Sequence, residues 1–239
     1  MPHELDDTWQ LLDDFAGAVQ LLHTHGGGDG EVLPALCDLA VKVTGADHAS
    51  VTTARGSTLT TVCATSEVAI RANELQFEMA EGPGFDALSE PGVSRVDDLT
   101  NDERWPDFGK RVAADLGLHS MLAQSLRVAD DTLGAITVYA ARGAAFDAEH
   151  LTVLSIMAAI ATTTLRVDRE VDRYQTLEAA LRTSRRIGIG LGILVATHKV
   201  TVDDAWELMS RESMNRNIKV SVMAENIIAT GTFEAPPEN

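Results

Sequence analysis

Apolar side chains recur at helical spacing at both ends of the chain and at alternate positions in its middle. Residues 4–23 and 32–43 each carry an apolar stripe at steps of three and four, which predicts two amphipathic helices. The glycine-rich run at 25–30 predicts a break between them. Gly45 is expected to end the second helix, because glycine tolerates the backbone conformation found at helix ends.

The middle of the chain follows the period of two that is typical of half-buried strands. Five stretches carry this pattern: 48–53, 59–64, 93–97, 118–128 and 133–141. The first two flank Gly56 and predict a hairpin, and the last two are expected to pair. Helices are expected after the turn at 81–87 and over 105–117, while residues 68–77 form either a helix or a covering segment. This order predicts an α+β fold with an antiparallel sheet and flanking helices.

A long helical pattern begins near Asp147, and residues 147–181 are assigned as a coupling helix. Its apolar residues alternate steps of four and three, as in a coiled-coil seam. The seam consists of Val153, Met157, Ile160, Val167, Val171, Tyr174 and Leu181, with Thr164 and Glu178 as polar interruptions. A second stripe, suited to pack on the sheet, consists of Leu154, Ala158, Ala161 and Leu165. The length suits a parallel coiled coil and so a homodimer; the alternative is a single helix packed within its own chain.

The C-terminal part, residues 173–235, carries three helical patterns separated by short turns. The first has its apolar face at Ile187, Leu191, Leu194 and Val195. Thr201 is expected to cap the second helix through its hydroxyl, with two acidic residues in the first turn. Trp206 is placed on the buried face of this helix beside Ala205. The third pattern ends at Gly231, so this part is predicted to be a small three-helix domain.

Charge is distributed unevenly between the two parts. The net charge is −17, and residues 1–172 carry 11 Lys and Arg against 28 Asp and Glu, while residues 173–239 carry eight of each. Between Arg182 and Lys219, seven cations outnumber four acids. Affinity for phosphate depends on Lys and Arg, so the first part is a poor nucleic-acid surface, whereas the local excess in the second permits such binding without requiring it.

The composition is that of a globular protein without a disulfide framework. Apolar residues make up 45% of the chain, and no apolar run approaches the roughly 20 residues that span a bilayer. The acidic N-terminus lacks the pattern of a signal peptide. Cys37 and Cys63 form no CxxC pair and are interpreted as small buried hydrophobes. We therefore expect a protein of the reducing cytoplasm with no membrane partner.

The sequence lacks the common motifs of enzymatic chemistry. It contains no GxSxG, HExxH or GxxxxGK[ST] motif, and the glycines at 188–192 lie in a helical pattern that favours close helix packing over a dinucleotide loop. His23 and His25 lie beside a glycine run and are interpreted as a surface loop rather than a metal site. His48 and His119 are interpreted as packed or hydrogen-bonded side chains. The sequence predicts no enzyme, no metal and no cofactor.

Several blocks near the C-terminus occur in the order found in a known family. They are SRRIG at 184–188, GIL at 192–194, TVDDA at 201–205, NIK at 217–219, and Ala224. Over roughly the last sixty residues the chain resembles the ANTAR domain, which implies an RNA-binding antitermination module that acts as a dimer. Where many members carry Ala-Lys-Gly, this chain has Gly190-Leu191-Gly192, so the lysine of that motif is missing.

Three further blocks lie in the N-terminal part: EGPGFDAL at 81–88, DLTNDERWPDF at 98–108 and LGAITVYA at 133–140. Over about residues 5–165 the chain resembles the GAF sensor domains found ahead of ANTAR modules in actinobacteria, and residues 1–165 are assigned to this domain. GAF domains bind diverse small molecules or only mediate dimerisation, so the resemblance specifies no ligand. Relatives often carry Cys at the position of Phe85, and this chain lacks it.

The resemblance and the residue types together single out an RNA-binding set. Proteins that read RNA hold phosphates with cations and reach the edges of loop bases with amides and hydroxyls. The expected residues are Arg182, Arg185, Arg186, Lys199, Ser213, Asn215, Arg216, Asn217 and Lys219. Asparagine also caps helices well, which is the alternative for Asn215 and Asn217.

These patterns predict a cytoplasmic, signal-responsive antitermination regulator in which a dimer binds paired hairpins of nascent RNA. A signal in the sensor, from an unidentified small molecule, would bias the packing of the coupling helix. The alternative is a small-molecule-sensing protein whose C-terminal bundle docks a protein partner. Leu191, in place of the family's lysine, and the small excess of positive charge favour that alternative.

Overall fold

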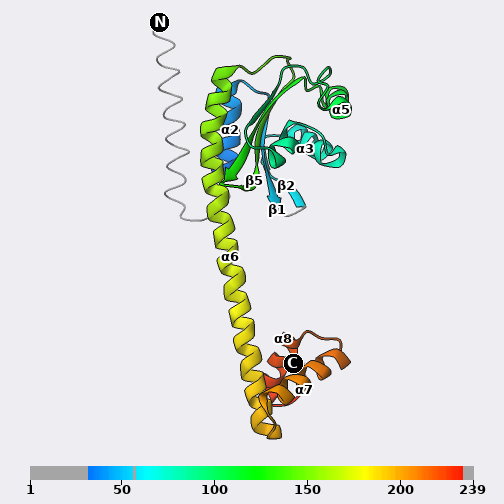
Figure 1. Cartoon of the computed structure of the whole chain (residues 1–239), viewed down its shortest axis with the longest axis vertical. Coiled ribbons are helices and arrows are strands. Elements are labelled where there is room, and N and C mark those ends of the chain that lie inside the picture. The colour runs from blue at the N-terminus through cyan, green and yellow to red at the C-terminus, as the bar shows by residue number, and fades with distance from the viewer. Residues whose placement is uncertain (1–31, 56–57, 234–239) are drawn as a thin grey trace. The chain divides into compact units, whose positions relative to one another are not determined.

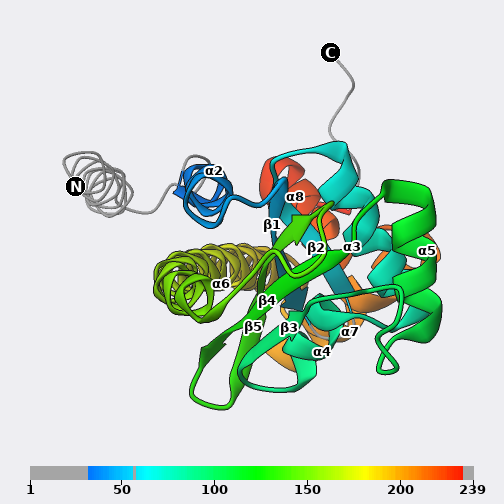
Figure 2. The same cartoon turned by 90° about the horizontal axis from the view of Figure 1, so that it is seen from above.

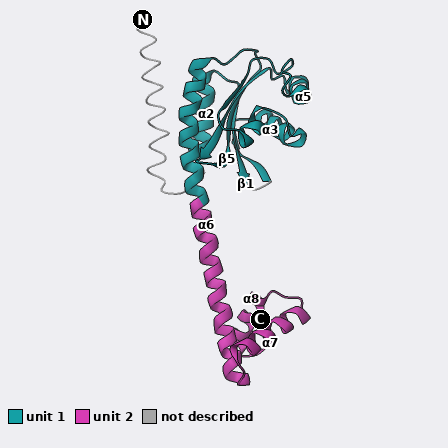
Figure 3. Ribbon diagram, in the orientation of Figure 1, with its two compact units in different colours: residues 1–169 teal, residues 170–239 magenta. Residues whose placement is uncertain are grey.

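A computed structural model describes residues 32–55 and 58–233 of the chain (Figure 1). They fall into two compact units, the first ending at Arg169 and the second beginning at Glu170 (Figure 3). One 51-residue helix, α6 (Ala148–His198), begins in the first unit and ends in the second. The helix predicted at 4–23 lies outside the described residues.

The first unit is built on an antiparallel sheet of five strands. The strands are β1 (His48–Arg55), β2 (Thr58–Ala64), β3 (Val93–Val96), β4 (Ser120–Val128) and β5 (Asp131–Ala140). Their order across the sheet is β2-β1-β5-β4-β3. The β1–β2 and β4–β5 pairs confirm both predicted hairpins. The predicted α+β fold with an antiparallel sheet is therefore confirmed.

Helices cover both faces of this sheet (Figure 2). One face carries α2 (Val32–Thr44) and the start of α6, and the other carries α3 (Glu67–Met79), α4 (Pro83–Ser89) and α5 (Pro106–Leu116). The segment left open at 68–77 is helical, as part of α3. Its start is fixed by Ser66, whose side chain accepts a hydrogen bond from the amide of Ala69 at 3.2 Å.

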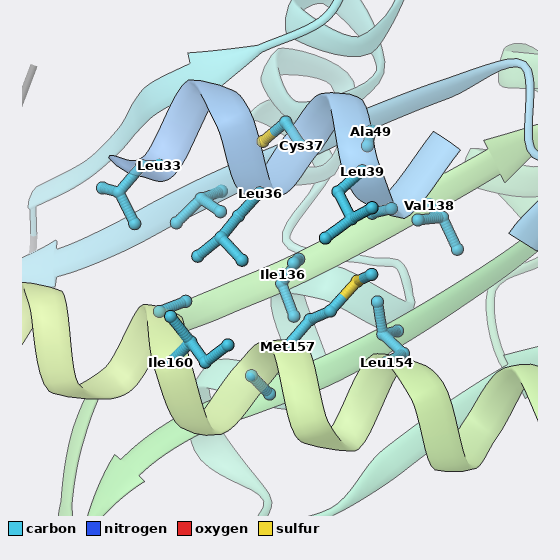
Figure 4. Packing of buried hydrophobic residues seen from close by; sticks show 14 of the residues in the cluster. Leu33, Leu36, Cys37, Leu39, Ala49, Ile136, Val138, Leu154, Met157 and Ile160 are labelled. Carbon is cyan, nitrogen blue, oxygen red and sulfur yellow. The ribbon is translucent and has the colours of Figure 1, made fainter. Parts of the chain in front are cut away.

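The face under α2 and α6 holds the larger apolar core of the first unit (Figure 4). The second predicted stripe of α6 packs there as expected. Two residues of the predicted seam lie in the same core: Met157 is 0% exposed and Ile160 is 9% exposed. Their assignment to a dimer seam is corrected, because these side chains already pack against α2 and the sheet of their own chain.

The second unit consists of the end of α6, α7 (Val202–Asn215) and α8 (Val220–Thr230). Its small core is made of Leu194, Ala205, Met209, Met223, Ala224 and Ile227. The first predicted C-terminal helix is not separate, because α6 continues without a break to His198. Arg185 and Arg186 therefore lie well inside α6. Gly190 lets α6 approach α8 closely, since a Cβ there would meet Ala224 at 3.3 Å.

The predicted ends of the C-terminal helices are confirmed. Thr201 forms a capping box with Asp204, whose amide donates to the Thr201 hydroxyl at 3.2 Å while its carboxylate accepts from the Thr201 amide at 3.2 Å. Gly231 ends α8 in the left-handed conformation, with φ of 75°.

The prediction for Trp206 is wrong. Its side chain is 46% exposed, whereas Ala205 and Met209 are fully buried. The buried face of α7 follows Ala205, Met209 and Ser213 at steps of four. Trp206 follows Ala205 by one residue, which turns it by about 100° around the helix axis, away from that face.

Helix α6 is long and apolar enough to cross a membrane by length and composition, although no uninterrupted apolar run has that length. A third of its most apolar stretch, 33%, is buried. Length and composition are weak indications of a membrane span, because the core helix of a globular protein meets the same criteria.

Candidate nucleic-acid interface

The nine predicted RNA-binding residues lie in three places of the second unit. Arg182, Arg185 and Arg186 lie on the last third of α6, and Lys199 directly follows that helix. The other five lie in the last turn of α7 or in the connection from α7 to α8, at 213–219.

The connection between α7 and α8 is a tight turn held by a buried hydroxyl. Ser213 is 4% exposed, and its Oγ donates to the carbonyl oxygen of Ile218 at 2.5 Å. Asn217 adopts the left-handed conformation, with φ of 53°, which asparagine tolerates better than most residues. The burial of Ser213 corrects its assignment as an RNA contact: this hydroxyl shapes the turn, while Asn215 and Asn217 remain exposed.

Arg216 connects three segments of the second unit. Its Nε donates to the carboxylate of Glu212 at 2.6 Å, and its Nη1 donates to the carbonyl oxygen of Phe233 at 2.6 Å. The hydrogen bond from Arg216 holds the pKa of Glu212 below its ordinary value. Arg216 therefore links the residues after α8 to the end of α7.

Two arginines of α6 are also engaged within the second unit. Arg186 forms a two-pronged ion pair with Glu225 of α8, and Arg182 pairs with Glu178 on its own helix at 2.9 Å. Both arginines line a hollow of about 240 Å³ between α6 and α8. The other lining residues are Thr183, Ser221, Val222 and Glu225.

The remaining predicted cations are open to solvent. Arg185, Lys199 and Lys219 are exposed, and within the described parts of the chain no hydrogen bond or ion pair of their side chains is found. A cation that is not already neutralised by a carboxylate is better placed to take an RNA phosphate. Of the predicted cations, these three are the most accessible to a phosphate.

The sequence reasoning missed Trp206 as a candidate contact. An exposed aromatic ring can stack on an unpaired RNA base, as is common in RNA recognition. Leu191 occupies the position where the family's lysine is missing, and it packs against the core of the second unit. Compared with the family pattern, this chain has the apolar Leu191 in place of a lysine, and it exposes the indole ring of Trp206 on α7.

The exposed apolar residues of α6 overlap only partly with the predicted seam. Large apolar side chains with more than 40% exposure occur on α6 at Ile156, Val167, Tyr174, Leu177, Leu181 and Ile189. Val171 is half-buried, and Val153 packs partly on the core of the first unit. Of the predicted seam, Val167, Val171, Tyr174 and Leu181 are therefore accessible to another chain, and Leu177 joins them.

In the first unit, the two blocks EGPGFDAL and DLTNDERWPDF contact each other. The indole Nε1 of Trp105 donates to Asp86 at 2.9 Å, and the amide of Phe108 donates to Glu81 at 3.2 Å. The amide of Phe85 is held by the side-chain oxygen of Gln76 at 3.3 Å. The motif residues therefore hold α4 and α5 together.

Beneath α3 lies a buried polar cluster. The Ser50 hydroxyl lies 3.1 Å from the hydroxyl of Tyr139, and the Tyr139 hydroxyl donates to Asn73. Burial raises the pKa of Tyr139 above its ordinary value. The Nε2 atom of Gln76 is buried without a hydrogen-bond partner among the described residues. This cluster places several polar groups inside the first unit.

The histidines give no metal site in the described residues. His48 Nδ1 lies 2.9 Å from the Ser66 hydroxyl, so its interpretation as a hydrogen-bonded residue is confirmed, and His119 is exposed. Among the described residues, no group of three His, Cys, Asp or Glu side chains could hold a metal ion. His23 and His25 lie outside the described residues.

Comparison with known families assigns both units. A family model described as GAF domain matches residues 30–166, more than half of the chain, and one described as ANTAR domain matches residues 175–228. The chain belongs to the GAF-domain family and carries an ANTAR domain after it. A search of curated proteins finds no match.

Solved structures agree on the fold of the first unit. The photosensory core module of a Stigmatella aurantiaca phytochrome has a TM-score of 0.55 at 11% identity, covering 92% of this chain and 46% of that one. The GAF domain of an Acinetobacter phosphoenolpyruvate-protein phosphotransferase has a TM-score of 0.51 at 11% identity, covering 69% and 98%. The chromophore-binding domain of an R. palustris bacteriophytochrome has a TM-score of 0.51 at 10% identity, covering 69% and 63%. At such identities the likeness shows the fold alone.

The pairing of domains gives the general activity. A GAF domain is a sensor domain and an ANTAR domain is an RNA-binding antitermination module. The chain is therefore an RNA-binding antitermination regulator with a GAF sensor.

Proposed function

We propose that two copies of this regulator join along α6 and bind a pair of hairpins in nascent RNA through their second units. Binding would keep the RNA from forming a terminator. The observation that carries the proposal is the ANTAR domain itself, in which Arg185, Lys199, Lys219 and Trp206 are all exposed.

The exposed stripe on α6 supports the joining of two chains. Tyr174, Leu177 and Leu181 are 71%, 55% and 62% exposed, although their side chains are large and apolar. Fully burying one such side chain contributes about 1.5–3 kcal/mol. Burying the stripe from Val167 to Leu181 on both chains would contribute on the order of 10 kcal/mol, which is comparable to the cost of association. A parallel pair of α6 helices is thus a reversible dimer in this proposal.

The exposed cations support phosphate binding of moderate strength. Arg185, Lys199 and Lys219 give a dimer six cations, and each phosphate neutralised lowers the slope of log affinity against log salt by about 0.7–0.9. We therefore expect a slope of roughly −4 to −5 for the dimer on RNA. The acidic first part, with 28 Asp and Glu against 11 Lys and Arg over residues 1–172, repels other RNA.

A signal in the first unit could act through the start of α6. Met157 and Ile160 belong to the core formed with α2 and the sheet, so a ligand that repacks this unit also acts on the helix that leads to the ANTAR domain. The buried polar cluster around Gln76 supports a small molecule with polar groups as the ligand. In this proposal the protein works in the cytoplasm and not in a membrane.

Hairpin binding by the full-length protein tests this proposal. A mobility-shift series should include pooled two-hairpin RNAs, single hairpins and a range of salt concentrations. Two-hairpin RNA should bind at least tenfold more tightly than single-hairpin RNA, because a dimer binds the second hairpin at a high effective concentration. Equal affinity for one and two hairpins would overturn the paired mode, and no binding to any hairpin would overturn the RNA target itself.

The exposed apolar residues of α7 favour one alternative. Val202, Trp206 and Met214 are 61%, 46% and 74% exposed, and such residues also suit a protein partner. If the second unit docks a protein instead, charge reversal at Lys219 will leave its target binding unchanged, whereas Met214→Glu will weaken it. If the target is RNA, charge reversal at Lys219 will weaken binding, whereas Met214→Glu will have little effect.

A further inference from the structure

The two cysteines of this chain meet in the first unit, although 26 positions separate them. Cys37 lies on α2 and Cys63 on β2, and their Sγ atoms are 3.0 Å apart. Both are free thiols. Cys37 is 1% exposed, whereas Cys63 is half-buried at the edge of the sheet.

A bulge in β2 turns Cys63 toward Cys37. Thr61 and Cys63 are two residues apart, and in a regular strand their side chains would point to the same face. Instead, Thr61 contacts Asn73 of α3 at 3.0 Å on one face, and Cys63 contacts α2 on the other. The register with β1 shifts between these positions, since Cys63 pairs with Val51 but Thr61 pairs with Thr52. Val62 is the extra residue, and it is 44% exposed.

We propose that Cys37 and Cys63 are a thiol pair that a hydroperoxide oxidises to a reversible intramolecular disulfide. In the first step the Cys63 thiolate attacks the peroxide O–O bond, forming the Cys63 sulfenic acid and releasing water or an alcohol after protonation. In the second step the sulfur of Cys37 attacks the Cys63 sulfur. The S–S bond forms, the S–O bond breaks, and the Cys37 proton leaves with the departing hydroxide as water. Two thiols are thus oxidised by two electrons and one peroxide is reduced.

The surroundings assign different roles to the two sulfurs. Cys63 is the more accessible, so a peroxide reaches it first, and Cys37 is enclosed by the apolar core. The hydrogen bond with Cys37 lowers the pKa of Cys63, and the same contact together with burial raises the pKa of Cys37. The thiolate is the form that reacts with peroxide. Cys63 is therefore the attacking residue and Cys37 the resolving one.

Disulfide formation would act on the core beneath α6. A disulfide holds its sulfurs about 2.05 Å apart, so the two sulfurs must close by about 1 Å. Cys37 shares its cluster with Met157 and Ile160, and a shift of α2 is felt by these side chains because the core is closely packed. Oxidation would then be a second input to the first unit, independent of any bound ligand.

The test uses the full-length reduced protein treated with hydrogen peroxide and then digested without reduction. The chain has two cysteines, so an intramolecular disulfide can join only this pair. We expect a peptide that links Cys37 to Cys63, an intact mass lower by two hydrogens, and reversal by a dithiol. This measurement needs no variant and therefore does not depend on a variant's folding.

Two serine variants then distinguish the steps. Cys37→Ser should accumulate a sulfenic acid at Cys63 that a cyclic dione traps, and Cys63→Ser should leave Cys37 unmodified at the same peroxide dose. Three results would overturn the proposal: a disulfide only between two chains, oxidation to sulfinic acid with no linked peptide, or no reaction at a dose that oxidises free cysteine.

Discussion

Arg186 of α6 and Glu225 of α8 form a two-pronged ion pair across the second unit. The preceding residue, Arg185, is exposed and makes no such contact within the described residues. Adjacent arginines of one sequence block thus have different surroundings, because α8 packs beside only one side of α6. This difference separates a residue that holds the domain together from one that is available to RNA.

The first prediction compares these two neighbours. Arg186→Ala should lower the free energy of unfolding of the second unit by a small but measurable amount, because it removes the solvent-screened ion pair that joins α6 to α8. Arg185→Ala should leave that stability unchanged and weaken hairpin binding about threefold to tenfold, because it removes phosphate contacts. Urea unfolding followed by circular dichroism and mobility shifts at fixed salt would measure both. Equal loss of stability in the two variants would contradict the assignment.

The second prediction concerns Trp206. If its ring stacks on an unpaired RNA base, Trp206→Ala should cost about 1–3 kcal/mol of binding, a roughly fivefold to 150-fold weaker affinity. Trp206→Phe should retain most of the affinity, since a phenyl ring also stacks. Stability should change little, because the side chain is 46% exposed.

Val202→Ala is the matched control for Trp206, because Val202 is 61% exposed and lies one turn earlier on α7. Its loss should leave RNA binding within a factor of two. Tryptophan fluorescence gives a second measurement. The chain has three tryptophans, so an RNA-induced change is assigned to Trp206 where Trp206→Phe abolishes it, and Trp105, only 3% exposed, should be insensitive to RNA. If hairpin RNA leaves the indole emission of the wild type unchanged, Trp206 is not at the interface.

The local patterns of the sequence were sufficient for most of the fold. The hairpins follow from β-branched alternation around short turns, and Thr201 and Gly231 mark helix ends through chemistry that lies within a few residues. Family resemblance then supplied the order of the two domains. None of these inferences required knowledge of which distant segments pack together.

The errors arose where the packing partner decides the outcome. Met157 and Ile160 fit a heptad seam, but the same spacing also suits a helix that lies on a sheet. In this structure both side chains pack against the sheet and α2. Trp206 lies one position after Ala205, which is on the buried face of α7. A short apolar pattern does not determine which of two adjacent positions faces the core. The approach of Cys37 to Cys63 depends on a bulge and on the docking of α2, neither of which local sequence reveals.

A third prediction follows from the capping box of α7. The hydrogen bonds from Thr201 lower the pKa of Asp204 below its ordinary value of 3.8. A lowered folded-state pKa means that the charged form stabilises the fold, so the contribution is complete above the ordinary value and is lost as the pH falls through the folded-state pKa. The stability difference between wild type and Asp204→Ala should therefore be largest near neutral pH and shrink below about pH 4.

Thermal melts of the second unit's helical signal between pH 7 and pH 3 would measure this dependence. Asp203→Ala is the matched control, because Asp203 lies in the same helical turn but takes no part in the capping box. Its effect on stability should vary less with pH than that of Asp204→Ala. A difference for Asp204→Ala that grows on acidification would contradict the sign of the shift.

The last prediction separates the exposed stripe of α6 from the residues that the structure buries. Leu181→Glu places a charge on a side chain that is 62% exposed and lies in the second unit. If two chains pair along α6, the buried charge should weaken the dimer by at least tenfold, because burying an unpaired carboxylate costs several kcal/mol. Met214→Glu is the matched control, since Met214 is 74% exposed on α7, away from this stripe.

Sedimentation velocity over a range of protein concentrations, with and without two-hairpin RNA, would measure the dimer. Leu181→Glu should shift the population to monomer and reduce the preference for two hairpins over one, while single-hairpin affinity stays near the wild-type value because Arg185, Lys199 and Lys219 are unchanged. Met214→Glu should remain dimeric. A dimer that withstands Leu181→Glu would place the pairing surface elsewhere, and a wild-type chain that stays monomeric even on RNA would remove α6 pairing from the mechanism.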